Sequence, residues 1–117
     1  MAYLKAFNNQ ILKLAKELST LYPENSDLKS LKNTLFLTIR TTPKLPIQVY
    51  RTHIYTPYND EILSENESFF LDLDLTGTTL QKLEYVKSVW KEASEENRNI
   101  IWKYLKVLNK LIERHFQ

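Results

Sequence analysis

The fold class is decided by one stretch near the end of the sequence, residues 94–116, which reads SEENRNIIWKYLKVLNKLIERHF. Its apolar side chains recur every three or four positions, which is the period of one helix face. The stripe consists of Ile101, Tyr104/Leu105, Leu108, Leu111/Ile112 and His115/Phe116. Ser94 precedes it as a candidate N-cap, and two glutamates follow where the helix dipole favours acids. We therefore predict a long amphipathic helix over residues 95–116.

The same period continues outward through much of the chain. It predicts further helices over residues 2–22, 27–40 and 78–92, the first ending at Pro23 and the second capped by Ser26. The tract Thr34–Thr42 is rich in β-branched residues, so a strand is the alternative for the second half of that helix. We expect the first and last long helices to pack against each other.

The middle segment, residues 41–76, has the least regular pattern. Thr42-Pro43 and Thr56-Pro57 each look like a cap followed by proline at the first helical position. We predict a short helix over residues 46–55 and one or two helical turns over 57–71, with a short strand near residues 70–75 as the alternative. The sequence as a whole predicts an all-α fold: one domain, residues 1–117, forming a compact helical bundle of about five helices. The irregular, proline-containing middle segment is expected to wrap around one end of this bundle.

The composition argues against several classes of protein. The 117 residues suit one domain, and they include a single glycine, Gly77, where phosphate loops and dinucleotide-binding folds need several. The absence of cysteine excludes disulfides and thiol chemistry, and two histidines are too few to suggest a zinc cluster. The first predicted helix carries lysines where a signal peptide would be apolar. No run of apolar residues approaches the length of about 18 that a membrane-spanning helix needs. We therefore expect no membrane association and a cytoplasmic location.

The charge is unevenly distributed along the chain. Residues 1–56 carry a net charge of +5, residues 57–76 carry six acids and no base, and residues 77–117 carry +3. One interpretation is that the acidic middle packs near basic faces of its own fold. The alternative leaves a basic surface free for nucleic acid.

The segment Phe69–Thr78 resembles two known motifs without completing either. Asp72 and Asp74 are spaced like the aspartates of haloacid-dehalogenase-type phosphatases, but such a fold needs further strands, a lysine and a later acidic pair. The same aspartates match the first positions of an EF-hand loop, whose twelfth position is here Leu83 instead of glutamate. We therefore expect no catalytic residue, metal or cofactor. The two aspartates are expected to be solvated. The leucines between them are expected to point inward: Leu71, Leu73 and Leu75.

Two sets of side chains are candidate binding residues. A basic stripe at helical spacing, joined by Arg51, is typical of a surface that follows a phosphate backbone: Lys103, Lys106, Lys110 and Arg114. Aromatic residues form the second set, because exposed tryptophan and tyrosine anchor protein partners: Trp90, Trp102, Tyr50, Tyr55 and Tyr58. The alternatives are a solvated lysine face and an aromatic core.

The last third also resembles a family of small uncharacterised helical proteins of nucleocytoplasmic large DNA viruses. The resemblance lies in the pattern Trp90…Ser94-Glu95-Glu96-Asn97-Arg98…Ile101-Trp102-Lys103-Tyr104-Leu105. It implies an intracellular viral protein and supplies no activity or catalytic residue. We therefore expect a non-enzymatic protein-interaction or virion-associated protein that self-associates. The alternative is a nucleic-acid-binding accessory protein that uses the basic stripe.

Overall fold

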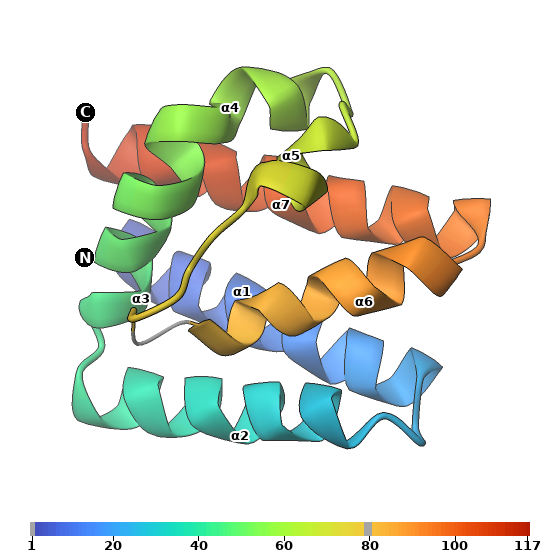
Figure 1. Cartoon of the computed structure of the whole chain (residues 1–117). Coiled ribbons are helices and arrows are strands. Elements are labelled where there is room, and N and C mark those ends of the chain that lie inside the picture. Colours follow the sequence, from blue (N-terminus) through green and yellow to red (C-terminus); the bar gives the residue numbers. More distant parts are fainter. Residues whose placement is uncertain (1, 79–80) are drawn as a thin grey trace.

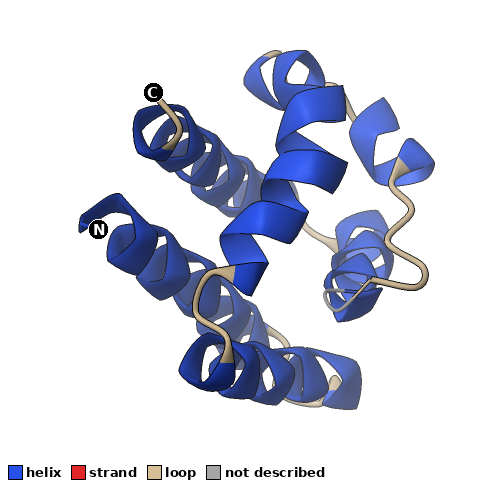
Figure 2. Cartoon of the chain, turned by 90° about the vertical axis from the view of Figure 1, so that its left-hand side faces the viewer, coloured by secondary structure: helices blue, strands red, loops and turns tan. Residues whose placement is uncertain are grey.

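The computed structural model describes residues 2–78 and 81–117, apart from the side chain of Leu83. These residues form seven α-helices, one π-helical turn and one 3-10 turn, with no strand among them (Figures 1 and 2). The helices are α1 (Ala2–Leu21), α2 (Ser26–Thr41), α3 (Leu45–Tyr50), α4 (Thr56–Leu63), α5 (Ser68–Asp72), α6 (Tyr85–Glu92) and α7 (Glu95–His115). The predicted all-α class is confirmed for the described residues. The count of about five helices is only approximate, because the middle segment and residues 81–92 divide into shorter pieces; residues 79–80 of the predicted helix 78–92 lie outside the described residues.

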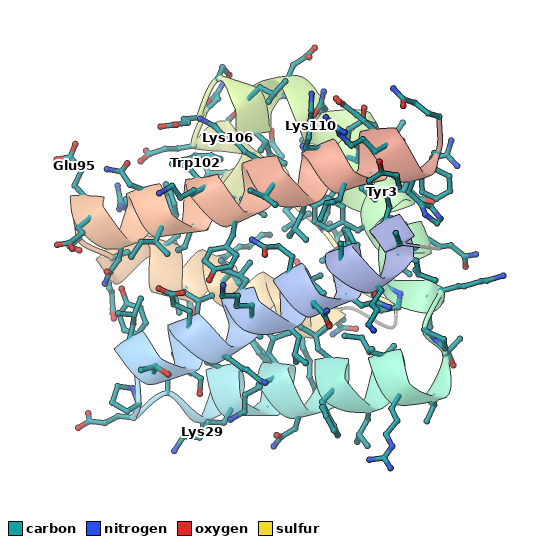
Figure 3. The ribbon with its side chains drawn as sticks, turned by 180° about the vertical axis from the view of Figure 1, so that it is seen from behind. Tyr3, Lys29, Glu95, Trp102, Lys106 and Lys110 are labelled. Carbon is teal, nitrogen blue, oxygen red and sulfur yellow. The ribbon has the colours of Figure 1, made fainter. Side chains whose placement is uncertain are left out.

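The two longest helices, α1 and α7, pack along each other, as predicted, and α2 covers the opposite flank of α1 (Figures 1 and 3). Two hydrogen bonds fasten α1 to α7. The Tyr104 hydroxyl donates to the Glu17 carboxylate at 2.6 Å, and the Asn97 amide donates to the Tyr22 hydroxyl at 3.0 Å. Ser94 caps α7 as expected, its hydroxyl accepting from the backbone N–H of Asn97 at 3.2 Å. The strongest periodic patterns therefore predicted the central helix pair.

The tyrosine in this interface makes stability depend on alkaline pH. Burial, with the hydrogen bond and the charge of Glu17 adding to it, raises the pKa of Tyr104 to about 12. An unfolded tyrosine titrates near pH 10. Because the folded pKa is the higher one, stability is fully present below about pH 10 and is lost as pH rises toward about 12. We expect urea unfolding between pH 8 and 11.5 to show this decline, and Tyr104→Phe to make it shallower. Tyr3→Phe, at an exposed tyrosine, is the control. An equal change of the alkaline decline in both variants would contradict its assignment to Tyr104.

Helix α2 begins at Ser26, the residue predicted to cap it, so its N-cap lies one residue earlier. Asn25 has an extended backbone, and its side-chain oxygen accepts from the N–H groups of Asp27 and Leu28 at 3.0 and 3.2 Å. The prediction of Ser26 as the cap is therefore wrong, because Ser26 is already helical. The strand alternative for residues 34–42 is also wrong: the helix continues to Thr41, whose hydroxyl donates to the carbonyl four residues earlier at 2.9 Å. Such a bond lets a threonine remain within a helix.

Helices α3 and α4 are joined by a π-helical turn, Arg51–Tyr55, into one continuous helical path. Thr56 has helical dihedral angles and its N–H donates to the carbonyl of Arg51, five residues back. The prediction that Thr56 caps a separate helix is therefore wrong, although Pro57 lies in the first turn of α4 as predicted. Proline lacks an N–H and clashes with the carbonyl four residues before it, and a widened turn relieves both problems. The predicted segment 46–55 is helical, but its second half has the wider turn.

The chain from Ser64 to Thr78 is helix or coil, which excludes the strand alternative for residues 70–75. Helix α5 is a single turn whose first N–H, that of Ser68, is accepted by the Asn66 side chain at 3.0 Å. After α5 the chain becomes extended at Leu73. Helix α5 lies over the side of α7 (Figure 1). The middle segment therefore covers a flank of the bundle as well as one end.

One apolar core joins all of these elements. At one end of it, four aromatic rings meet: Phe70 stacks on Trp90 with centroids 4.2 Å apart, and Trp102 stands edge-on to Trp90 at 5.0 Å. Phe69 packs edge-on against Phe70 at 4.8 Å. These rings come from α5, α6 and α7, so the aromatic cluster fixes the short helices against the long one. Edge-on and offset stacking are the favoured geometries of aromatic pairs.

A buried polar cluster ties the middle segment to α7. The Tyr50 hydroxyl donates to the side-chain oxygen of Asn109 at 2.7 Å, and the Asn109 amide donates to the side-chain oxygen of Asn59 at 2.9 Å. Tyr50 and Asn109 are each only 1 % exposed. Because buried polar groups are costly unless paired, this cluster fixes where the α3–α4 path docks.

Candidate functional site

A surface groove lies between α5 and α6 and extends to the start of α7. Its volume is about 860 Å³, and its walls include Phe70, Leu71, Tyr85 and Trp90 together with charged side chains of both signs. The cavity inside the core, by contrast, is apolar and holds only about 30 Å³. A space of that size is too small for a substrate, and its apolar walls offer a water molecule no hydrogen-bond partners. The groove is therefore the candidate functional site.

Leu71 stands on the wall of this groove with 76 % of its surface exposed. The prediction that three leucines point inward is right for Leu73 and Leu75, which are buried, and wrong for Leu71. The cause is local: Phe69 and Phe70 occupy the buried side of the single turn of α5, so the next residue must face outward. An exposed leucine beside aromatic rings is the kind of side chain that buries well in a partner.

Arg98 forms one rim of the groove and holds its parts together. Its guanidinium donates to the carbonyls of Trp90 at 3.1 Å and Lys91 at 3.4 Å, and it pairs with Glu67 at 2.9 Å. It also lies 5.0 Å from the centroid of the Trp90 ring, within cation–π range. Arg98 therefore satisfies the last carbonyls of α6 and clamps the end of that helix to the chain just before α5. The sequence pattern does not indicate this role, because the partners of Arg98 lie up to 31 residues away along the chain.

The acidic middle of the chain pairs with basic residues of its own fold. Glu67 pairs with Arg98, and Glu65 pairs with Lys106. Both partners belong to α7. These contacts agree with the interpretation that the acidic stretch packs near the chain's own basic faces.

The predicted basic stripe lies on one face of α7 but is partly occupied. Lys106 pairs with Glu65, and Lys110 lies 3.9 Å from Glu113, whereas Lys103 and Arg114 are exposed. Figure 3 shows Lys106 and Lys110 on the edge of α7 that faces the middle segment. Arg51 lies 3.9 Å above the ring of Phe116, so its charge is brought to the end of the same helix. Acids near two of its lysines weaken this stripe as a phosphate-binding surface.

Three of the five aromatic candidates are core residues. Trp90, Trp102 and Tyr50 are 5 %, 4 % and 1 % exposed, so the prediction that they anchor a partner at the surface is corrected for this fold. Each is covered by other rings or by the polar cluster around Asn109. The helical spacing that suggested a binding face is also the spacing of a core stripe.

The remaining two aromatic candidates, Tyr55 and Tyr58, are half-buried. The Tyr55 hydroxyl donates to Glu113 at 3.3 Å, and the Tyr58 hydroxyl donates to the backbone carbonyl of Asp72 at 3.2 Å. Partial burial and neighbouring acids raise the pKa of both phenols. Both hydroxyls fasten the middle segment in place, and the structure does not bring the five aromatics together.

The two aspartates of the segment 69–78 are exposed, as predicted. Asp74 accepts from the backbone N–H of Thr76 at 2.9 Å, and hydrogen bonding to Thr76 lowers the pKa of its carboxyl. In the part of the chain that the structure describes, no three histidine, aspartate or glutamate side chains gather closely enough to hold a metal ion. No helix formed by the described residues combines the length and the apolarity needed to cross a membrane.

Comparison with known proteins finds no family whose model matches the chain, and no similar chain among the curated proteins or the solved structures. The function is therefore argued from the site alone.

Proposed function

We propose that this protein is a non-enzymatic interaction protein that self-associates through the groove between α5 and α6. The observation that carries the proposal is the exposure of Leu71, 76 %, directly beside the aromatic wall of a groove of about 860 Å³. Burying a leucine side chain contributes about 1.5–3 kcal/mol. A soluble chain gains this energy only when another molecule covers the site.

The arrangement suits a second copy of the chain as the partner. A two-fold symmetric interface needs a projection and a matching hollow on the same surface, because each copy must supply both. Here Leu71 is the projection, and the groove beside Tyr85 and Trp90 is the hollow. The rim also carries both signs of charge, including the neighbours Lys91 and Glu92. Two copies related by a two-fold axis can place these charges opposite each other.

Replacing Leu71 with aspartate tests the proposal. Each symmetric interface buries this side chain twice, so two losses of about 1.5 kcal/mol or more weaken dimerisation by about 100-fold or more. We expect sedimentation equilibrium to show a concentration-dependent dimer for the parent protein and a monomer for Leu71→Asp over the same range.

The matched control is Leu37→Asp, at another exposed leucine, 59 % exposed on α2. It makes the same chemical change away from the groove and is expected to keep the dimer. A parent protein that is monomeric at all concentrations, or equal weakening by both variants, would overturn self-association through this groove. Circular dichroism checks that both variants remain helical.

The relation to viral proteins implied by the last third of the sequence, and association with a virion, stay predictions. The proposed dimer requires neither.

A further inference from the structure

A second surface, on the opposite flank of the fold, carries six of the twelve bases that form no ion pair with the described acids. The four ion pairs among the described residues all involve bases of residues 82–114. Helices α1 and α2 hold six further bases, which form no ion pair with the described acids: Lys5, Lys13, Lys16, Lys29, Lys32 and Arg40. Five of these side chains are exposed and Lys32 is half-buried.

The acids of the same two helices are directed elsewhere. Glu17 accepts the hydroxyl of Tyr104 on α7, and Asp27 lines the groove between α5 and α6. Glu17 also lines a surface pocket with Lys13 and Lys16, so the surface shared by α1 and α2 carries six bases against one neighbouring acid. Figure 3 shows this surface, with α1 and α2 side by side and Lys29 on the outer edge of α2.

The bases follow rows along both helices. Lys5 and Lys16 are separated by eleven residues, about three turns, so they lie on one face of α1 about 16 Å apart. On α2 the side chains of Lys29, Lys32, Phe36 and Arg40 follow at steps of three, four and four, which also places them on one face. Of these residues, Lys16, Lys32 and Phe36 line the space between the two helices, and Lys29 lies on the outer edge of α2 (Figure 3).

A groove of about 410 Å³ runs between these rows. Lys16 stands on its α1 wall, Lys32 and the amide of Asn33 stand on its α2 wall, and the ring of Phe36 lines it with 48 % exposure. Ammonium groups bind phosphates, and an exposed ring offers a stacking surface for any base. An aromatic ring between lysines in a groove is the arrangement by which proteins bind unpaired strands.

We propose that the face formed by α1 and α2 binds single-stranded nucleic acid, with phosphates along the lysine rows and a base stacked on Phe36. A duplex keeps its bases stacked inside and would leave the ring unused. A lipid surface would attract the same charges, but a helix lying on it inserts a continuous apolar face, whereas this ring lies in a groove walled by lysines.

The test measures binding of the full chain to a fluorescent 20-nucleotide oligo-dT by anisotropy over a range of salt concentrations. Six phosphate contacts at about −0.7 each predict a slope of log K against log salt near −4. The double variant Lys16→Gln/Lys32→Gln is expected to reduce the magnitude of that slope by about 1.4. Phe36→Ala is expected to weaken binding about 5- to 150-fold with the slope unchanged, since it removes stacking and no charge.

The control, Lys103→Gln/Lys110→Gln, removes the same charge from α7 and is expected to change affinity less than about twofold. An equal loss in both double variants would assign the binding to net charge or to the α7 stripe. Full binding by Phe36→Ala, equal affinity for a duplex of the same length, or absence of binding at low salt would each overturn the proposal. So would binding to phosphatidylserine vesicles without binding to the oligonucleotide. Leu71→Asp leaves this face intact, so the test is independent of the proposed dimer.

Discussion

Trp102→Ala is expected to lower the free energy of unfolding by about 3–5 kcal/mol, the usual cost of removing a large aromatic side chain from a core. Trp102 is 4 % exposed, and its ring contacts the rings of Phe70 and Trp90 at centroid distances of 5.2 and 5.0 Å. Its loss leaves a cavity where α5, α6 and α7 meet. Because small domains are stable by about 5–15 kcal/mol in total, this change removes a large share of the stability.

Urea unfolding followed by circular dichroism measures the effect, and two further variants keep it interpretable. Trp102→Phe retains a ring in the cluster and is expected to be destabilised less, so it remains measurable if the alanine variant does not fold. Phe36→Ala, at an exposed aromatic residue, is expected to change stability by no more than about 0.5 kcal/mol. If Trp102→Ala unfolds like the parent protein but loses self-association, Trp102 is a surface anchor and the core assignment is wrong.

The sequence was most informative where structure is set locally. The stripes of α1 and α7 have apolar residues at three- and four-residue steps, and Ser94 lies directly before the second stripe. Both helices follow from these patterns, because helix period and capping depend on neighbours within four residues. The π-helical turn before Pro57 is also a local consequence, but a proline after threonine equally suggests a new helix. Only the continuous helical backbone distinguishes the two cases.

The candidate sites depended on contacts between distant residues, which a single sequence does not reveal. Whether the stripe on α7 is free depends on such a contact, because Lys106 pairs with Glu65, 41 residues away along the chain. Trp90 and Trp102 had the spacing of a binding face, and burial of both rings beneath α5 decided against it. The alternation of apolar and acidic residues over 70–75 predicts that Leu71 points into the core, whereas the single turn of α5 directs it outward.

A second large effect is expected at the polar cluster that joins α7 to the middle segment. Asn109→Ala removes the acceptor of the Tyr50 hydroxyl and the donor to the Asn59 side chain. The buried Tyr50 hydroxyl keeps only a 3.5 Å contact to the carbonyl of Leu105, at a cost of about 1–3 kcal/mol. The half-buried Asn59 oxygen loses its donor at a smaller cost, so we expect a loss of about 2–4 kcal/mol in the free energy of unfolding. Asn99→Ala is the matched control: the same change at an exposed position of the same helix, expected to stay within about 0.5 kcal/mol.

A double-mutant cycle separates the hydrogen bond from packing. Tyr50→Phe leaves the buried Asn109 oxygen without its donor, and Asn109→Leu leaves the Tyr50 hydroxyl with only the long 3.5 Å contact to the Leu105 carbonyl, so each single variant weakens the pairing of a buried group. The double variant strands neither of these two groups. Its cost should therefore be smaller than the sum of the single costs by about 0.5–3 kcal/mol. Strict additivity would mean that the Tyr50–Asn109 bond adds no stability, and that shape alone docks the α3–α4 path against α7.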